Sequence, residues 1–169
     1  DRELKPIMSG DPDPFVKEVL GKILAGRGDE LPVSAFPVDG TFPTGTTQYE
    51  KRGIADFIPI WDDEQLCTQC NKCVAICPHA AIRAKVYDKS LLDEAPITLK
   101  HIGAKGRPFD KDNDVYTLQV AVEDCTGCNL CVEVCPAHSK ENEDYKAINM
   151  HDMVERKDVE KVKWEYFAE

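Results

Sequence analysis

The sequence predicts an α+β fold in which short strands and helices surround two cysteine-rich loops. Two runs of cysteines share one spacing, and each run passes into a short apolar segment of helical type. Stretches of alternating apolar and polar residues near these runs are typical of half-buried strands. A helix and a long segment rich in proline and glycine precede this region.

The first predicted element is a helix that begins at Asp13 and Pro14, which form an N-cap and first-turn pair. Gly26 and Gly28 end it. Its apolar residues share one face: Phe15, Val16, Val19, Leu20, Ile23 and Leu24. This spacing predicts an amphipathic helix that packs against the rest of the chain or against a neighbouring domain.

Residues 31–59 are expected to form an extended segment, called the strap below, that packs across other surfaces of the protein. Prolines throughout this segment exclude a long helix: Pro32, Pro37, Pro43 and Pro59. The group from Thr44 to Thr47 has residues that could cradle a phosphate, but it lacks the spacing of a phosphate-binding loop. A structural role is therefore the preferred interpretation.

Short elements follow from about Trp61 onward. Residues 73–77 and 131–135 predict two short helices that contain the last two cysteines of each run. Three stretches predict strands because their side chains alternate in polarity: residues 82–87, 116–124 and 146–150. The last of these is the expected equivalent, in a pseudo-twofold repeat, of the strand at 82–87.

Two further segments complete the prediction. Residues 88–114 predict an insertion on the surface, since they contain glycines, prolines and the polar turn at 110–114. That turn resembles a calcium loop in its acidic spacing, but the required glycine and terminal glutamate are missing, so a solvated turn is preferred. Residues 153–167 predict a charged helix.

The cysteines indicate the chemistry. Cys67, Cys70, Cys73 and Cys77 precede Pro78, and Cys125, Cys128, Cys131 and Cys135 precede Pro136. This is the spacing of bacterial two-cluster ferredoxins, in which the last cysteine of each run ligates the other run's [4Fe-4S] cube. The predicted ligands of cluster 1 are therefore Cys67, Cys70, Cys73 and Cys135. Those of cluster 2 are Cys125, Cys128, Cys131 and Cys77.

Other uses of these cysteines fit the sequence less well. A disulfide framework is typical of short secreted chains, whereas this chain has 169 residues and no apolar signal segment. Four-thiolate zinc sites use two cysteine pairs per ion and do not require a third cysteine followed by proline. His79 and His138 follow the runs, but the eight thiolates already fill every ligand position.

Apolar residues beside the cysteines are expected to keep the sites dry, which tunes cluster potentials. The candidates within the runs are Val74, Ile76, Val132 and Val134. Three aromatic residues are also expected near the clusters: Phe57, Trp61 and Tyr87. No residue is expected to be a catalytic acid, base or nucleophile.

The charge of the chain limits its partners. The formal net charge is −10, and two cubes with four thiolates each, at −2 apiece, would bring it to −14. Nucleic acid is therefore not expected as a partner. The negative charge suits either brief docking onto basic patches of redox partners or simply solubility. No run of 18 apolar residues occurs, so no membrane span is expected. Eight reduced thiols predict a cytoplasmic location and anaerobic metabolism.

Two segments carry a more specific resemblance. GTFPTGTTQYEKRGIADFIPIW followed by CTQCNKCVAICPHAAIR resembles the pyruvate:ferredoxin (flavodoxin) oxidoreductase family, and EDCTGCNLCVEVCPA is similar to its second cluster loop. The resemblance implies three parts: a helix and a linker named for Glu50, Lys51 and Arg52 at 1–60, a ferredoxin domain at 61–150, and a linker helix at 151–169. Residues 1–30 and the final KVKWEYFAE look like the edges of neighbouring domains.

The resemblance implies an electron-transfer module of an enzyme that decarboxylates pyruvate oxidatively to acetyl-coenzyme A. Thiamine diphosphate, magnesium and a third [4Fe-4S] cluster would belong to other domains of that parent enzyme, and external ferredoxin or flavodoxin would accept the electrons. Two alternatives remain open on the sequence alone. One is a free-standing two-cluster ferredoxin, and the other is a cluster subunit of another redox complex.

Overall fold

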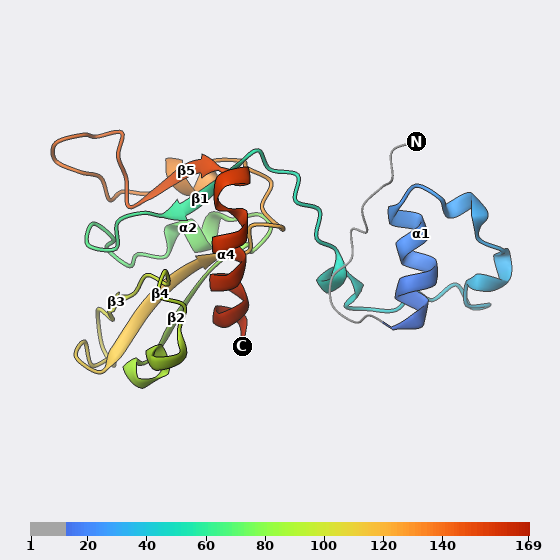
Figure 1. Cartoon of the computed structure of the whole chain (residues 1–169), viewed down its shortest axis with the longest axis horizontal. Helices are drawn as coiled ribbons and strands as arrows, with labels where there is room; N and C mark the ends of the chain where they lie inside the picture. Colours follow the sequence, from blue (N-terminus) through green and yellow to red (C-terminus); the bar gives the residue numbers. More distant parts are fainter. Residues whose placement is uncertain (1–12) are drawn as a thin grey trace. The chain divides into compact units, whose positions relative to one another are not determined.

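The computed structural model describes residues 13–169, and the chain forms two compact units, residues 1–52 and 53–169. Figure 1 shows the helix α1 in the first unit and all five strands in the second. The first twelve residues of the predicted segment 1–60 lie outside the described residues. No helix among residues 13–169 is long and apolar enough to cross a membrane.

The helix of the first unit starts and stops where the sequence predicts. A π-helical stretch (Val16–Leu20) continues into α1 (Gly21–Leu24). The backbone N–H of Phe15 donates to Asp13 Oδ1 at 2.8 Å, which is the expected N-cap bond. Gly26 ends the helix in a left-handed conformation, with φ of 70°. On its apolar face Val16, Val19 and Leu20 are buried, whereas Ile23 is 39% exposed.

Residues 25–52 of the first unit have little regular structure. Three 3-10 turns interrupt this segment: Gly28–Glu30, Val33–Ala35 and Thr46–Tyr49. Side-chain contacts stabilise it locally. Arg27 and Glu30 form an ion pair at 2.8 Å, and the ring of Phe15 packs edge-on against that of Phe42 with 5.3 Å between centroids. Short turns of this kind follow from prolines, which cannot continue a helix.

The second unit contains two small antiparallel sheets. In one, β1 (Phe57–Trp61) pairs with β5 (Ile148–Asp152). In the other, β4 (Asp114–Val120) lies between β2 (Ile82–Asp88) and the short β3 (Ile102–Gly103). The strands predicted near 82–87, 116–124 and 146–150 are confirmed as β2, β4 and β5.

The strand β1 is absent from the sequence prediction, which assigned residues up to 59 to the strap. Proline lacks the N–H that a residue of a central strand must donate. β1, however, has only one partner, β5, so a proline can occupy a position whose nitrogen is not needed for pairing. Ile58, Pro59, Ile60 and Trp61 are all buried.

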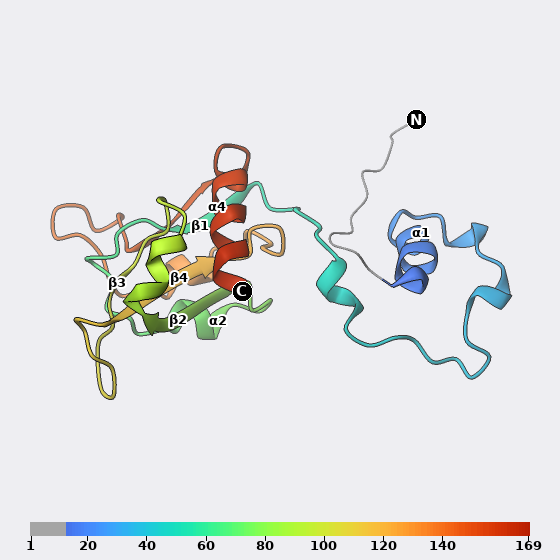
Figure 2. The same ribbon diagram turned by 60° about the horizontal axis from the view of Figure 1, so that its bottom comes forward.

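Three α-helices belong to this unit, besides a 3-10 helix (Lys89–Glu94) in the insertion. The two short ones, α2 (Lys72–Ile76) and α3 (Leu130–Glu133), confirm the predicted helices within the cysteine runs. The predicted C-terminal helix is α4 (Met153–Ala168), whose first turn is capped by Asp152 Oδ1 accepting from the Val154 N–H at 2.8 Å. Figure 2 shows α4 lying beside the sheet of β2 and β4.

The strand β4 is buried on both faces, so it forms the middle layer of the unit. Tyr116, Leu118 and Val120 belong to the apolar core that also contains the cysteines. The opposite face lies under α4, where Arg83 of β2 stacks on Trp164 with 5.6 Å from the guanidinium carbon to the ring centroid. The buried polar residues of β4, Thr117 and Gln119, alternate with these core residues and so lie on the opposite face.

The insertion at 88–114 is more than the surface excursion that its composition suggests. Its β3 strand pairs with β4, and Thr117 Oγ1 donates to the carbonyl of Lys100 at 2.7 Å. At Gly103 a Cβ atom would lie 2.6 Å from the carbonyl oxygen of Lys111, so only glycine permits this close approach. Backbone pairing holds this segment against the domain even though its sequence is polar.

A buried ion pair in α4 provides a test of this packing. Lys163 Nζ lies 2.5 Å from Glu160 Oε1, and the two residues are only 6% and 5% exposed. We expect Lys163→Met to lower the free energy of unfolding by about 3 kcal/mol, because it leaves a buried carboxylate without its partner. Anaerobic urea unfolding of the iron-loaded chain, followed by circular dichroism, measures this change.

Two controls make this test specific. Arg27→Met breaks an exposed pair with Glu30 and should leave the unfolding midpoint unchanged. The double variant Glu160→Leu/Lys163→Met removes both charges and should recover most of the lost stability. Equal loss in the single and double variants would contradict a role for the unpaired charge.

Candidate metal centres

Both cysteine loops have the same backbone conformation. The second residue after the first cysteine is left-handed in each, with φ of 58° at Gln69 and 70° at Gly127. The residue after the second cysteine is also left-handed, with φ of 56° at Asn71 and 63° at Asn129. Asparagine and glycine adopt this conformation at low cost. The repeated turns curl each loop, and α2 or α3 begins directly after them.

The left-handed turns also direct backbone N–H groups at sulfur. The N–H of Gln69 donates to Cys67 Sγ at 3.4 Å, and the N–H of Gly127 donates to Cys125 Sγ at the same distance. Such bonds stabilise a negatively charged sulfur. At Gly127 a Cβ atom would lie 3.0 Å from the carbonyl oxygen of Phe57, so the loop approaches β1 closely.

Two hollows in the second unit bring the cysteines together. The first hollow is lined by Cys67, Cys70, Cys73 and Cys135. The second hollow is lined by Cys125, Cys128, Cys131 and Cys77. Each hollow thus combines three cysteines of one run with the last cysteine of the other run, which is the grouping the spacing predicts. Ligation of iron by these sulfurs stays a prediction.

The sulfurs fit a cluster better than a single ion. All eight cysteines are free. Among residues 13–169, no three histidine, cysteine, aspartate or glutamate side chains are close enough to hold one metal ion. A zinc ion needs four sulfurs at about 2.3 Å from one point, whereas a [4Fe-4S] cube separates its four thiolates around a larger body. The eight cysteines therefore fit two [4Fe-4S] clusters.

Burial controls the protonation of these thiols. Removal from water raises the pKa of Cys73 and of Cys131 to about 12. At neutral pH these two thiols are protonated before metal binds, so binding as thiolates releases protons. Cys70 and Cys128 differ from the others because their side chains are exposed.

The two hollows have different walls. The apolar and aromatic lining of the first comes from Trp61, Tyr116, Leu118, Ala137, Ala147 and Ile148. That of the second comes from Pro59, Ala81, Ile82, Leu130 and Met150. Aromatic side chains therefore line only the first hollow within the described part of the chain.

Of the aromatic residues expected near the clusters, only Trp61 lines a hollow. Phe57 is 55% exposed, and Tyr87 lies on the α4 side, close to Tyr166. Alternation along β2 places Tyr87 on the same face as Arg83 and Lys85, which contact α4.

Only some of the apolar residues within the runs pack near the cysteines. Val74 and Val132 pack against the core that contains the cysteines, while Ile76 is 41% exposed. Of the two histidines after the runs, the exposed His79 lines the second hollow. His138 is instead near the carbonyl of Ser139, with 3.1 Å from Nδ1 to oxygen.

Tyr116 is a site residue that the sequence prediction missed. Its ring lines the first hollow, and its hydroxyl donates to Asn71 Oδ1 at 2.7 Å. Burial raises the pKa of the Tyr116 hydroxyl, so it remains a donor. The signal in the sequence was its position in an alternating strand, but alternation alone does not say which face meets the cysteines.

The insertion fastens the first cysteine loop. Gln69 Nε2 donates to the carbonyl of Gly103 at 2.8 Å, and Gln69 Oε1 accepts from the backbone N–H of Lys105 at 2.8 Å. The Lys105 ammonium in turn donates to the carbonyl of Cys67 at 2.9 Å. The insertion thus holds the loop through hydrogen bonds between residues that are 34 to 38 positions apart in the sequence.

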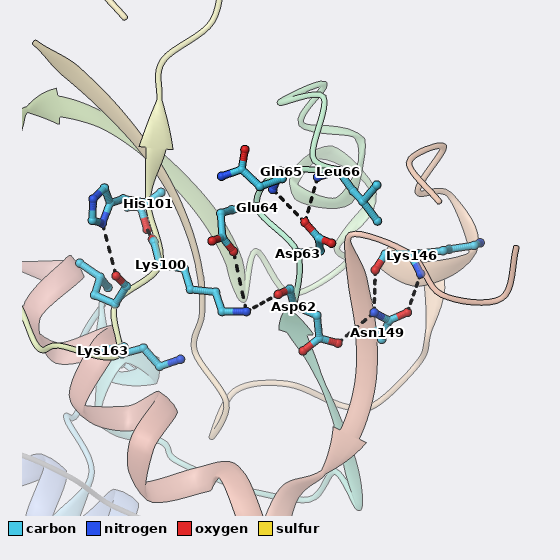
Figure 3. Close-up of polar contacts among 12 residues, drawn as sticks. Asp62, Asp63, Glu64, Gln65, Leu66, Lys100, His101, Lys146, Asn149 and Lys163 are labelled. Atoms are coloured by element: carbon cyan, nitrogen blue, oxygen red, sulfur yellow. Dashed lines mark hydrogen bonds and ion pairs between the residues drawn. The ribbon is translucent and has the colours of Figure 1, made fainter. Parts of the chain in front are cut away.

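A polar network holds the segment that enters the first loop, and Figure 3 draws its bonds from Asp62 to Asn149 and from Asp63 to Gln65 and Leu66. Asp62 Oδ2 lies 2.9 Å from the donating Nδ2 of Asn149 and 2.6 Å from Nε2 of His151. Asp63 Oδ1 accepts from the N–H groups of Gln65 and Leu66 at 2.9 and 3.0 Å. The contacts of Asp62 anchor the turn between β1 and Cys67 to β5, and those of Asp63 hold the turn itself.

Comparison with known families agrees with this geometry. A family model called EKR, described as a domain of unknown function, matches residues 1–55. A second model, described as a 4Fe-4S dicluster domain, matches residues 66–139. The second match contains all eight cysteines, so it covers both complete runs.

Several curated relatives are long enzymes. A pyruvate-flavodoxin oxidoreductase of Nostoc sp. is 54% identical over 153 residues, which are 90% of this chain and 12% of that protein. A probable pyruvate-flavodoxin oxidoreductase of Escherichia coli is 54% identical over 96% of this chain and 14% of its own length. A pyruvate:ferredoxin oxidoreductase of Moorella thermoacetica is 49% identical over 75% of this chain. The chain thus spans about an eighth of the first two relatives.

The crossed grouping of cysteines predicts selective damage. We expect Cys135→Ala to disrupt the cluster bound by Cys67, Cys70 and Cys73, and to lower bound iron from about eight to about four atoms per chain. The matched variant Cys77→Ala should disrupt the other cluster. Iron analysis and electron paramagnetic resonance (EPR) spectra of the two variants check this, and loss of the same cluster in both would contradict the crossing.

Iron removal should also unfold the residues around the hollows. The elements between 61 and 150 are short, and the two hollows occupy the middle of their core. We therefore expect anaerobic chelation of iron to abolish most of their regular structure, because cluster binding and folding are coupled. Far-ultraviolet circular dichroism measures this, and an unchanged spectrum in the iron-free chain would refute it.

Proposed function

We propose that this chain conducts electrons within a pyruvate-flavodoxin oxidoreductase, the family to which it belongs, and that it does so through the 4Fe-4S dicluster domain that follows its EKR domain. The observation that carries this proposal is the pair of hollows, each lined by four cysteines drawn from both runs. When bound there, [4Fe-4S] clusters supply one-electron oxidation and reduction.

The cysteines hold the clusters and no other side chain performs chemistry in this proposal. The ligands of cluster 1 are Cys67, Cys70, Cys73 and Cys135, and those of cluster 2 are Cys125, Cys128, Cys131 and Cys77. Support comes from the common lining of each hollow and from the N–H bonds to Cys67 and Cys125. Residues 61–150 form the cluster-bearing part, 1–60 the preceding linker segment, and 151–169 a linker helix.

Three features of the residues suit electron conduction. The two sites are neighbours, since α2 contacts α3 and Cys73 is near enough to Cys131 to influence its pKa. The walls are largely apolar, which limits water around the clusters. Cys70 and Cys128 are exposed, so each site has one edge at the surface through which electrons can enter or leave.

The activity of the whole enzyme is part of the proposal. The names of the relatives support pyruvate as the substrate and flavodoxin or ferredoxin as the external acceptor. Thiamine diphosphate, magnesium and a third cluster would be bound by other domains of the parent enzyme, which are this chain's partners. A reducing cytoplasm suits the eight free thiols.

The experiment is a single-turnover reaction of the iron-loaded chain. Under anaerobic conditions the chain should accept about two electrons from dithionite, one per cluster, as counted by EPR spin quantitation. Mixed with oxidised flavodoxin, the reduced chain should form flavodoxin semiquinone, measured by stopped-flow absorbance.

The control is the same chain after iron removal, which should transfer no electrons. The chain alone should not oxidise pyruvate, because the proposal assigns it no catalytic residue. Failure to take up electrons, or pyruvate oxidation by this chain alone, would overturn the proposed function.

A further inference from the structure

We infer that Trp61 raises the reduction potential of cluster 1, because its indole N–H donates a hydrogen bond to a sulfur of that site and cluster 2 has no counterpart. Trp61 is thus a positioning and tuning residue, distinct from the ligands. The inference rests on the proposed function, since it needs clusters in both hollows.

The indole nitrogen of Trp61 is a buried donor without an acceptor. Trp61 is 4% exposed, and its Nε1 is buried without a hydrogen-bond partner among the described residues. A buried donor without an acceptor costs about 1–3 kcal/mol, so such groups call for an explanation. Trp61 lines the hollow of Cys67, Cys70, Cys73 and Cys135, whose sulfurs are the nearby acceptors.

The two hollows differ in this donor. The backbone N–H of Gln69 has its equivalent in Gly127 at the second site, but the indole has none there.

The surroundings prevent the indole from turning away. The backbone of Trp61 is paired with Ile148 at the end of β1. Its ring meets the ring of Tyr116 edge-on, with 5.8 Å between centroids and 77° between planes. The Tyr116 hydroxyl is itself bonded to Asn71 in the first cysteine loop. Two sheets and the loop thus determine where the N–H points.

The effect on potential follows from charge. Reduction adds one negative charge to the site, so a donor stabilises the reduced form more than the oxidised form and raises the potential. Little water competes with the donor in a buried wall, which strengthens the bond.

The remaining lining residues do not compensate. Thr68 and Asn71 of the first hollow have counterparts at the same loop positions in the second, Thr126 and Asn129. Two other polar side chains differ: the Tyr116 hydroxyl of the first hollow already donates to Asn71, and His79 of the second hollow is exposed, where water screens any effect. Trp61 is therefore the principal electrostatic difference between the sites.

An EPR-monitored redox titration of the iron-loaded chain tests this inference. Trp61→Phe should lower the midpoint potential of one cluster and leave the other unchanged, with iron content at the wild-type level. The affected signal should be the one that survives unaltered in Cys128→Ser, a change confined to the second site. Trp164→Phe, which removes the chain's other tryptophan on α4, should shift neither potential.

The sign of the change separates the hydrogen bond from mere packing. A packing defect that admits water would raise the potential, whereas loss of the donor lowers it. A rise, no shift, or equal shifts of both clusters would overturn the inference.

A second measurement avoids any folding defect of the variant. In the Trp164→Phe chain labelled with indole ¹⁵N, Trp61 is the only labelled residue. Pulsed EPR should then detect ¹⁵N coupled to one reduced cluster, and no coupling to either would equally overturn the inference. A chain that binds no clusters would instead refute the proposed function, so the two failures are distinguishable.

Discussion

The crossed pairing of strands is the constraint on which the cluster-bearing unit depends. Because β1 pairs with β5 and β2 pairs with β4, the strands that flank one cysteine run are bound to the strands that flank the other. The last cysteine of each run therefore meets the first three of its counterpart. Neither loop can form its site alone, so the two halves fold as one body with two sites at its centre.

This arrangement explains why so small a core is sufficient. The helices α2 and α3 are only five and four residues long, and an isolated helix of that length is not stable in water. Their stability has to come from the strands, from α4 across the outer face of β4, and from metal bound to the cysteines. The polar insertion contributes through Gln69 and Lys105, which tie a cysteine loop to β3.

The near symmetry of the two loops makes their differences informative. Matching left-handed turns give each loop the same N–H bond to sulfur, so the backbone treats both sites alike. Side chains from outside the loops break this equality: Trp61 and Tyr116 at one hollow, Pro59 and Met150 at the other. In an electron-conducting chain, two sites of unequal potential define an order of electron occupancy.

The sequence by itself determined the elements with local signals. Cysteine spacing is a property of one loop, helix caps such as Asp13 lie within a turn, and alternation in residues 82–87 identifies a strand without its partner. Only the tertiary structure decided what depends on distant pairing. It showed that β1 can contain Pro59 because this strand has a single partner. It also showed that the insertion is hydrogen-bonded to the first cysteine loop, and that Tyr116 rather than Tyr87 faces the cysteines. The physical reason is that each of these outcomes depends on which face or edge a distant segment covers, and alternation along one strand is the same for either choice.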